Sequence, residues 1–468
     1  MATFTGDASG LRRVNFLLLG AFLAILILFG GASRADALSQ PIVRIAAIVA
    51  GAAALLQISS QQWRSVRTPF LSLATVGLVI VVQLVPIPFG LWSDLPGRGH
   101  FAEMLAVAGV PEAWRPLTMT PDLAWNSALA ILAPLAFVLG LSVAGPQALR
   151  ALLPLLLAGI GLHSVIGLIQ VAGGTPYFYR VTNLDSAVGL FANRNHLAVF
   201  VALILPLSGL WALLPHPDPA YRRLRFWMAL CIAAAAIPFL IMIGSRAGLL
   251  VGGLGAIAVF PLILTQPSEP RRATREKRLW MIAFIPALIA LVAVIAARAS
   301  GRDLALQRLF EADTGLRADH LPIYFRMIGD FFPFGSGFGS FDSIFRGYEP
   351  QASLNASYLN HAHNDLVQIV IEGGLPALLL AAAFAIWFAL TAIRLWVSRV
   401  RSSADLYGRV GSIVVLQLIV ASAVDYPLRT PLLGVVFIIA CFWMLRFESS
   451  DKSSGGAEGR VGTGKAFD

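Results

Sequence analysis

Cysteine and charged residues are both scarce in this chain, and each scarcity argues against a class of protein. Cysteine occurs only at Cys231 and Cys441, each inside an apolar run, which argues against a disulfide framework and a cysteine-based metal site. Charged residues make up 13% of the 468 residues, whereas 57% are hydrophobic. A water-soluble globular protein of this size needs more charge on its surface. We infer that the bilayer is the solvent of most of the chain.

Long apolar runs recur along the chain, and a helix needs ~20 apolar residues to cross a bilayer. The runs predict an all-α, polytopic membrane protein with about 12 transmembrane helices, although short connections within 226–265 and 409–446 leave one helix more or fewer open. The first run follows Arg12 and Arg13 without a convincing cleavage site, so we interpret it as a retained helix. The predicted spans are 14–32, 41–58, 69–89, 124–145, 149–172, 191–213, 226–243, 247–265, 279–297, 374–397, 409–424 and 429–446.

Basic residues are distributed in a way that indicates topology. The net charge of +10 is scattered between apolar runs and forms no aromatic-flanked patch, so no nucleic acid is expected as a partner. Short arginine-rich loops predict, by the positive-inside rule, a multi-pass inner-membrane protein with both termini in the cytoplasm. These loops contain Arg64 and Arg67; Arg222, Arg223 and Arg225; Arg271, Arg272, Arg275, Lys277 and Arg278; and Arg394, Arg399, Arg401 and Arg409.

The predicted organisation is one transmembrane domain over 1–446, interrupted by a long periplasmic loop, 298–364, before the tenth helix. A second outer segment covers 90–123. Within the long loop, residues 316–332 have helical spacing, with apolar Leu321, Phe325 and Ile328, and we expect an amphipathic helix on the membrane that ends at Pro333. The Gly- and Ser-rich tail 447–468 is predicted to be disordered and cytoplasmic.

Two clusters of polar residues lie where predicted helices reach the outer face. Arg246 lies in the tight turn Gly244–Gly248, and Asn193, Arg194 and Asn195 open the span that follows an outer loop containing Arg180. An arginine fork matches phosphate oxygens, and a helix N-terminus presents free N–H groups to an anion. Both clusters are candidates for binding a phosphate or diphosphate. A snorkelling arginine and a simple polar helix cap are the open alternatives.

A third cluster, His361 to Asp365, closes the long outer loop. Histidines two residues apart are poorly placed to share a metal, and a third ligand is absent from the local sequence, so no metal is expected. An imidazole can accept a proton from a sugar hydroxyl near neutral pH, which makes His363 a candidate general base. A structural histidine is the alternative. Asn364 could orient the histidine or a substrate, and Asp365 or Glu372 could hold the imidazole tautomer.

A glycine-rich run, Phe334 to Phe341, precedes this cluster. It lacks the preceding strand and the following lysine of a nucleotide-binding loop, so we reject that interpretation. A tight outer loop whose aromatic rings stack on sugars and a loop whose rings are packed inside remain open.

Taken together, these motifs in this order resemble the O-antigen ligase and polymerase superfamily of bacterial membrane glycosyltransferases, over roughly Gly189 to Trp443. His363, Asn364 and Gly374 fit the ligase pattern, whereas Ala377 stands where that pattern has Gly, Thr or Tyr. The other elements that look like those of the family are Gly189-Leu-Phe-Ala-Asn-Arg-Asn195, Ser245-Arg-Ala-Gly248, Arg317 followed by Pro333-Phe-Gly-Ser-Gly337, and Asp425-Tyr-Pro-Leu-Arg429.

The resemblance implies transfer of a glycan from an undecaprenyl-diphosphate donor to a lipid or glycan acceptor at the periplasmic face, without a metal or cofactor. It implies His363 as base, Arg246 and Arg194 as diphosphate ligands, and Arg317 as a weaker third. A polymerase of O-antigen or exopolysaccharide repeat units, with a chain-length regulator as partner, is the alternative within the superfamily. Rivals from other classes are a secondary transporter and a non-enzymatic envelope subunit, but the predicted spans are almost uncharged at their centres.

Overall fold

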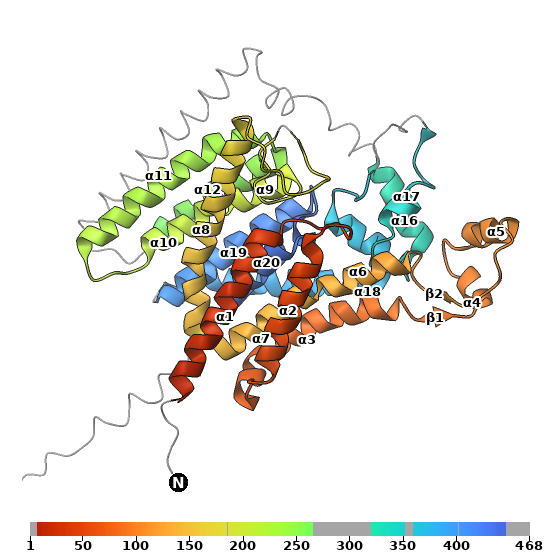
Figure 1. Ribbon diagram of the computed structural model, residues 1–468, viewed down its shortest axis with the longest axis horizontal. Helices are drawn as coiled ribbons and strands as arrows, with labels where there is room; N and C mark the ends of the chain where they lie inside the picture. Colours follow the sequence, from red (N-terminus) through yellow and green to blue (C-terminus); the bar gives the residue numbers. More distant parts are fainter. Residues whose placement is uncertain (1–6, 185, 265–319, 352–358, 401, 446–468) are drawn as a thin grey trace, which may run out of the picture.

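The computed structural model describes residues 7–184, 186–264, 320–351, 359–400 and 402–445. It shows an all-α polytopic membrane protein (Figure 1). In the described residues, regular strands are limited to β1 (Pro86–Ile87) and β2 (Arg115–Pro116), which pair antiparallel with Ile87 opposite Arg115.

Helices account for nearly all other regular structure in the described part of the chain. In chain order they are α1 (Asp7–Phe29), α2 (Ser39–Leu55), α3 (Ser60–Val82), α4 (Phe89–Ser93), α5 (Gly99–Val107), α6 (Pro121–Ala130), α7 (Leu132–Ala144), α8 (Pro146–Val171), α9 (Arg194–Ala202), α10 (Ile204–Leu213), α11 (Pro219–Ile243), α12 (Arg246–Leu264), α16 (Leu321–Phe331), α17 (Phe341–Phe345), α18 (Asp365–Val397), α19 (Ser403–Ser422), the short 3-10 helix η2 (Pro427–Arg429) and α20 (Pro431–Met444).

The helices confirm the membrane class but not the count of twelve. Among described residues, nine continuous helical segments are long and apolar enough to cross a bilayer, and α2 and α20 are shorter apolar helices. Eleven of the predicted spans coincide with these helices, with ends that differ by several residues, and the span 279–297 lies outside the described residues. The starts of α3 and α18 differ most, each by nine residues. α3 begins at Ser60 instead of 69, where Ser59 caps it, and α18 begins at Asp365 instead of 374, where Asn364 caps it.

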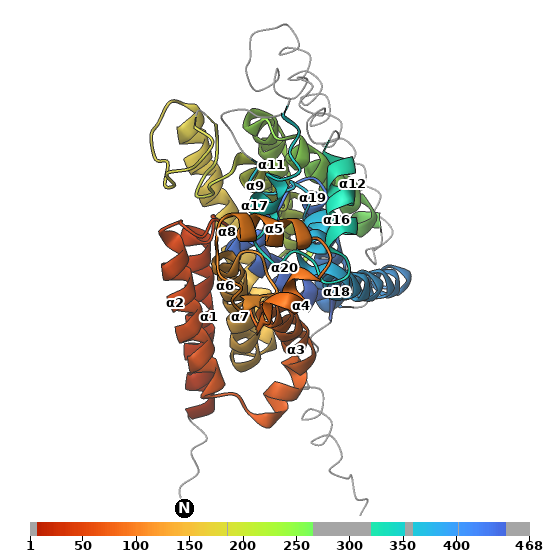
Figure 2. The same ribbon diagram turned by 90° about the vertical axis from the view of Figure 1, so that its right-hand side faces the viewer.

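The bundle has a buried centre and a lipid-like exterior. Helices α9, α19 and α20 form much of the core and are buried on most sides. By contrast α18 exposes large apolar side chains, such as Leu379 and Ile386, to the surroundings. Exposed leucine and isoleucine along a helix of this length are expected where lipid is the solvent. Figure 2 shows α1 and α2 on one flank and α18 on the opposite flank.

Beyond the spans, α4, α5, α16 and α17 gather at one end of the bundle (Figure 1). Arg98 links the two outer segments, because its buried guanidinium donates to the carbonyls of Leu117 and Gly335. Burial lowers the pKa of Arg98 to about 10. A separate apolar cluster centred on Met327, Phe331 and Phe341 fills the interior of this unit.

The amphipathic helix expected over 316–332 is α16, and its inner face is different from the predicted apolar stripe. Tyr324, Met327 and Phe331 are the buried residues, whereas Phe325 is 63% exposed. The aromatic and methionine side chains turn inward because they meet α17 and α18. Of the predicted loop 298–364, residues 298–319 and 352–358 lie outside the described residues, and so does the tail 447–468.

Candidate active site

The structure places His363 directly before the start of α18, in an uncommon backbone conformation. His363 has φ of 50°, and among described residues it is the one non-glycine residue with positive φ. Such a conformation costs free energy unless the surroundings hold it, and it is found more often at functional sites. The next residue, Asn364, caps α18, because its side-chain oxygen accepts from the Val367 amide at 3.1 Å. The helix start therefore determines where the imidazole lies.

A buried carboxylate holds the imidazole of His363. The distance between His363 Nδ1 and Asp425 Oδ1 is 2.9 Å, and the side chain of Asp425 is 0% exposed. Burial would raise the pKa of Asp425, but the hydrogen bond from His363 and the electrostatic interactions with the neighbouring imidazoles of His196 and His363 outweigh it and hold that pKa well below its usual value. The Asn195 side chain acts in the same direction. Asp425 is therefore an anion.

This pairing determines the tautomer of His363. A carboxylate can only accept, so the proton lies on Nδ1, and Nε2 carries the lone pair. With 17% of its side chain exposed, His363 is reachable whereas Asp425 is closed off. We expected Asp365 or Glu372 to hold this tautomer, and the structure gives that position to Asp425. The reason is tertiary, because Asp425 follows α19, far from His363 in sequence.

The ring of Tyr426 contacts three imidazole rings. Its ring centroid lies 4.2 Å from His361, 5.1 Å from His363 and 5.0 Å from His196. Tyr426 is buried, and burial together with Asp425 raises its pKa to about 12, so the phenol stays protonated. Its hydroxyl accepts from Asn193 Nδ2 at 3.5 Å. The expected helix-opening asparagines thus contact the same residue as the histidines.

Two helices begin beside this cluster, each with one of the predicted arginines as its first residue. The side chain of Asn193 caps α9 at the Asn195 amide, and Ser245 Oγ accepts from the Gly248 amide at 3.1 Å in the first turn of α12. A Cβ on Gly248 would overlap Ala198, so the two first turns are in close contact. Arg194 and Arg246 therefore start neighbouring helices at the same end of the bundle, and both are partly buried.

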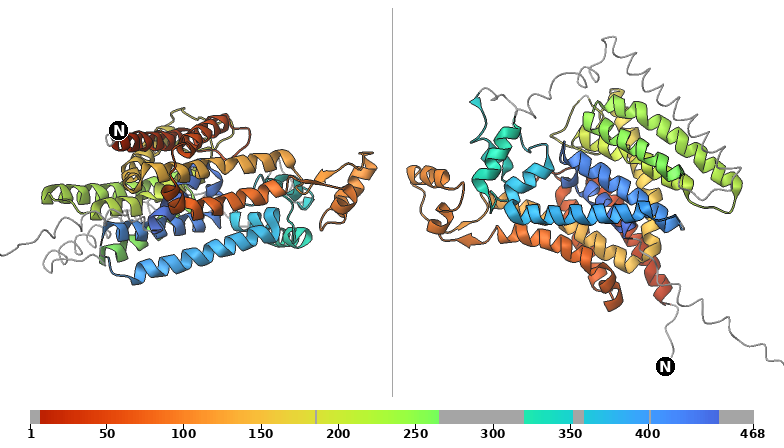
Figure 3. Two further views of the ribbon diagram at one scale, coloured as in Figure 1. Left: turned by 90° about the horizontal axis from the view of Figure 1, so that it is seen from below. Right: turned by 180° about the vertical axis from the view of Figure 1, so that it is seen from behind.

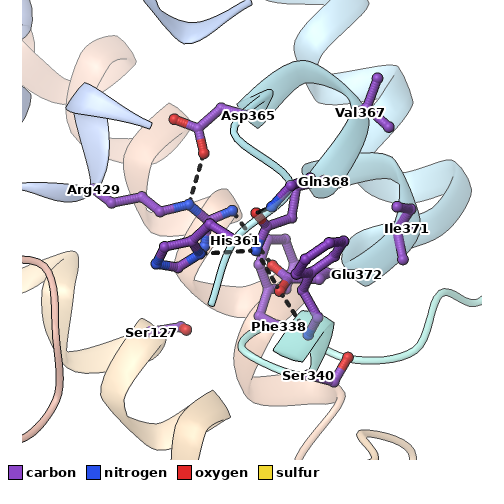
Figure 4. A network of polar contacts seen from close by, with 12 residues as sticks. Ser127, Phe338, Ser340, His361, Asp365, Val367, Gln368, Ile371, Glu372 and Arg429 are labelled. Carbon is purple, nitrogen blue, oxygen red and sulfur yellow. Dashed lines mark hydrogen bonds and ion pairs between the residues drawn. The ribbon is translucent and has the colours of Figure 1, made fainter. Parts of the chain in front are cut away.

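Arg429 forms a second ionic cluster with Asp365 and Glu372 (Figure 4). Its Nε contacts Asp365 Oδ1 at 2.6 Å, and a second nitrogen contacts Glu372 Oε2 at 3.5 Å. Burial alone would lower the pKa of Arg429, but the two carboxylates raise it. Glu372 also accepts from the Phe341 amide at 3.2 Å. This cluster ties α18, η2 and the glycine-rich loop together.

The glycine-rich loop packs against α18 instead of presenting a free surface. Gln83, at the end of α3, accepts from the Phe338 amide at 3.0 Å and donates to the Glu372 carbonyl at 3.0 Å. α18 is kinked at Gly374, with φ of 58°, where a Cβ would overlap the Pro333 carbonyl. Phe341 is fully buried, and Phe334 is 42% exposed. The sequence left open whether the rings of this loop stack on sugars or pack inside the protein, and the ring of Phe341 packs inside.

One of the predicted residues that the structure describes is not joined to this cluster. Arg180 is exposed, and its guanidinium pairs with Asp36 at 3.3 Å. Its predicted role in substrate binding stays a prediction. Arg317 lies outside the described residues. Within the described ranges, no group of three or more His, Cys, Asp or Glu residues is placed to hold a metal ion.

One family model matches part of the chain. The family model of O-antigen ligases matches residues 229–382, a region that contains Arg246 and His363. Over this region, about a third of its length, the chain is similar to the O-antigen ligase and polymerase superfamily. No curated protein matches the chain. The match supports a membrane-embedded protein similar to enzymes of the ligase or polymerase type.

The sequence alone predicted the loop histidine and the two clusters at helix starts but not most of the residues that contact them. Asp425 and Arg429 were visible as charged residues between two apolar spans, although nothing local connected them with His363. Gln368 gave no signal, and Tyr426 was noted only within the element Asp425-Tyr-Pro-Leu-Arg429, because an amide or a phenol near a helix end has many roles. Gln83 lies 289 positions from Glu372 and could not be connected with it from sequence.

Proposed function

We propose that the protein is an inverting, metal-independent glycosyltransferase that moves a glycan from undecaprenyl diphosphate to an acceptor hydroxyl at the periplasmic face of the inner membrane. The observation that carries this proposal is the hydrogen bond between His363 Nδ1 and the buried Asp425 carboxylate. It leaves Nε2 of a partly exposed imidazole with a lone pair, which is what a general base requires.

In the proposed reaction, His363 Nε2 takes the proton of the acceptor hydroxyl as the oxygen attacks the anomeric carbon of the donor. The new bond joins the acceptor oxygen to that carbon, and the bond between the carbon and the diphosphate oxygen breaks. The electron pair leaves with the lipid diphosphate. Asp425 stabilises the imidazolium that forms. Attack from the side opposite the diphosphate inverts the anomeric configuration.

Arg246 and Arg194 are the proposed diphosphate ligands. Both open helices that are in contact near their starts, so the two guanidinium groups and the positive ends of two helix dipoles favour an anion at the same end of the bundle. Arg429 is not proposed as a diphosphate ligand, because two carboxylates neutralise it. Charge developing on the leaving diphosphate would be stabilised by the first two arginines.

The test is glycan transfer by the full-length protein and its His363→Ala variant, with a lipid-diphosphate glycan donor. Removing a general base is expected to lower the transfer rate by about 10²- to 10⁴-fold. His100→Ala is the matched control, because His100 is an exposed histidine on α5. Normal transfer by the folded His363→Ala variant would refute the proposal. Deleting the protein and asking which surface glycan becomes short or unattached separates ligase from polymerase.

A further inference from the structure

A second histidine of the same loop, His361, has no role in the proposed reaction. It is partly buried, and its ring lies against Tyr426, nearer than the ring of His363 does. One residue, Ala362, separates the two histidines along the chain, and both rings contact the phenol ring of Tyr426. The protonation of His361 can be worked out from its neighbours in the same way as that of His363.

Gln368 determines which nitrogen of His361 carries the proton. The Ala362 amide can only donate, and it lies 2.9 Å from Gln368 Oε1, so this atom is the amide oxygen. The Glu372 carboxylate accepts from Gln368 Nε2 at 2.9 Å. The remaining N–H of the Gln368 amide therefore points to His361 Nδ1, at 3.2 Å. Figure 4 shows Gln368 between His361 and Glu372.

Because Nδ1 of His361 accepts, its proton lies on Nε2. Burial and the nearby Arg429 cation lower the pKa of His361 well below its usual value, so the ring is neutral. The two histidines thus hold opposite tautomers: His363 presents a lone pair on Nε2, and His361 presents an N–H. One imidazole accepts a proton, and its neighbour donates a hydrogen bond.

We infer that His361 is an acceptor-binding residue, whose Nε2–H donates to a hydroxyl oxygen of the acceptor sugar and holds that sugar for attack beside His363. The inference rests on the proposed function. A neutral N–H suits an uncharged hydroxyl oxygen, whereas an anionic diphosphate is better matched by Arg246 and Arg194. Both imidazoles belong to one loop and contact the ring of Tyr426, so a sugar bound beside one of them lies close to the other.

Two substitutions separate this role from a structural one. In His361→Asn, the amide oxygen stands near the place of Nδ1 and can still accept from Gln368, but no donor reaches the place of Nε2. In His361→Gln, the amide nitrogen reaches the place of Nε2 and restores a donor, while the partner of Gln368 is lost. The substrate role predicts that Gln rescues, and the structural role predicts that Asn rescues.

The measurement is steady-state transfer by the full-length protein in detergent, with KM determined separately for donor and acceptor. We expect His361→Asn to raise the acceptor KM roughly tenfold, with the donor KM and kcat within about twofold of wild type, since one hydrogen bond made equally in ground and transition states is lost. His361→Gln should return the acceptor KM to within about threefold of wild type. Thermal unfolding checks that both variants are folded.

An unchanged acceptor KM in His361→Asn would overturn the inference, and so would rescue by Asn but not by Gln. An equal rise of donor and acceptor KM in both variants would also overturn it, because it would indicate a general disturbance of the loop. Absence of transfer by the wild-type protein would refute the proposed function itself, and the inference would fall with it. Loss of transfer in His363→Ala alongside a normal acceptor KM in His361→Asn would refute only the inference.

Discussion

Two ionic clusters lie side by side at the start of α18, and they differ in how completely their charges are matched. In one, Arg429 is held between Asp365 and Glu372, so every charged group has an opposite charge as its neighbour. In the other, Asp425 holds one nitrogen of His363 and leaves the second nitrogen with a lone pair. The difference teaches that a count of buried charges does not locate the chemistry. A group with remaining bonding capacity and access to substrate does.

The two clusters are joined through the backbone and so influence each other. The Asp365 amide donates to the Asp425 carbonyl at 3.4 Å, which connects the first residue of α18 to the residue that holds His363. Figure 3 shows the length of α18, which runs from this region along the outside of the bundle. Because the charges of Arg429, Asp365 and Glu372 are matched, a change there is expected to act mainly on stability. A change in the His363–Asp425 pair is expected to act mainly on catalysis.

The sharpest test of the open pair is Asp425→Asn. The asparagine amide can donate to Nδ1, which would place the proton of His363 on Nε2 and remove the base. We expect transfer to fall by about 10²- to 10⁴-fold, as for loss of the base itself, while the protein remains folded. Steady-state transfer and thermal unfolding in detergent measure the two effects. A transfer rate equal to wild type would mean that Asp425 does not set the tautomer.

Arg429→Ala tests the matched cluster. It leaves the two carboxylates close together without a cation, and removal of one partner from a buried pair costs about 3–5 kcal/mol. Because the Arg429 side chain is 20% exposed, we expect a loss at the lower end, about 3 kcal/mol in the free energy of unfolding. Denaturant unfolding measures it.

The matched control is a triple variant, Arg429→Met with Asp365→Asn and Glu372→Gln, which removes the charges together. It should recover most of the lost stability, because neutral polar groups cost less to bury than unpaired carboxylates. If the triple variant is as unstable as Arg429→Ala, the cation contributes through packing and not through charge.

Arg246→Lys asks whether an arginine outside both clusters is the one that binds substrate. Lysine keeps the positive charge but loses the bidentate fork, so we expect the donor KM to rise about tenfold with little change in unfolding. Arg346→Lys is the matched control, since Arg346 is exposed and pairs with Asp342 on one turn of helix. An equal effect of both substitutions would show that the fork of Arg246 has no special role.

Asn364→Ala has the smallest expected effect and separates capping from substrate binding. Loss of the cap of α18 should lower the free energy of unfolding by about 1 kcal/mol. Asn364→Ser keeps a capping oxygen and should unfold like wild type. If Ser restores stability but not transfer, Asn364 also contacts substrate, which is its predicted role. Full restoration of both would leave it a cap alone.

The sequence was enough to establish the solvent of the protein and the class of its elements. So many apolar runs long enough to cross a bilayer indicate that lipid surrounds them. In lipid, only a helix forms all of its backbone hydrogen bonds within one segment, so the all-α membrane fold follows from composition and spacing. The polar residues His363, Arg246 and Arg194 could be selected in the same way. Charged and polar groups at the ends of apolar spans are few, and each needs a reason to be there.

Only the tertiary structure decided which of these groups are partners. Asp425 and Tyr426 meet the loop histidines because α18, α19 and η2 converge, and contacts between segments so far apart in sequence leave no local pattern. Gln368 meets His361 only seven positions away, where the loop folds back on the first turn of α18. The tautomers of His361 and His363 follow from those partners and not from their shared motif. Sequence selected the residues that can do chemistry, and packing assigned to one histidine a lone pair and to the other a proton.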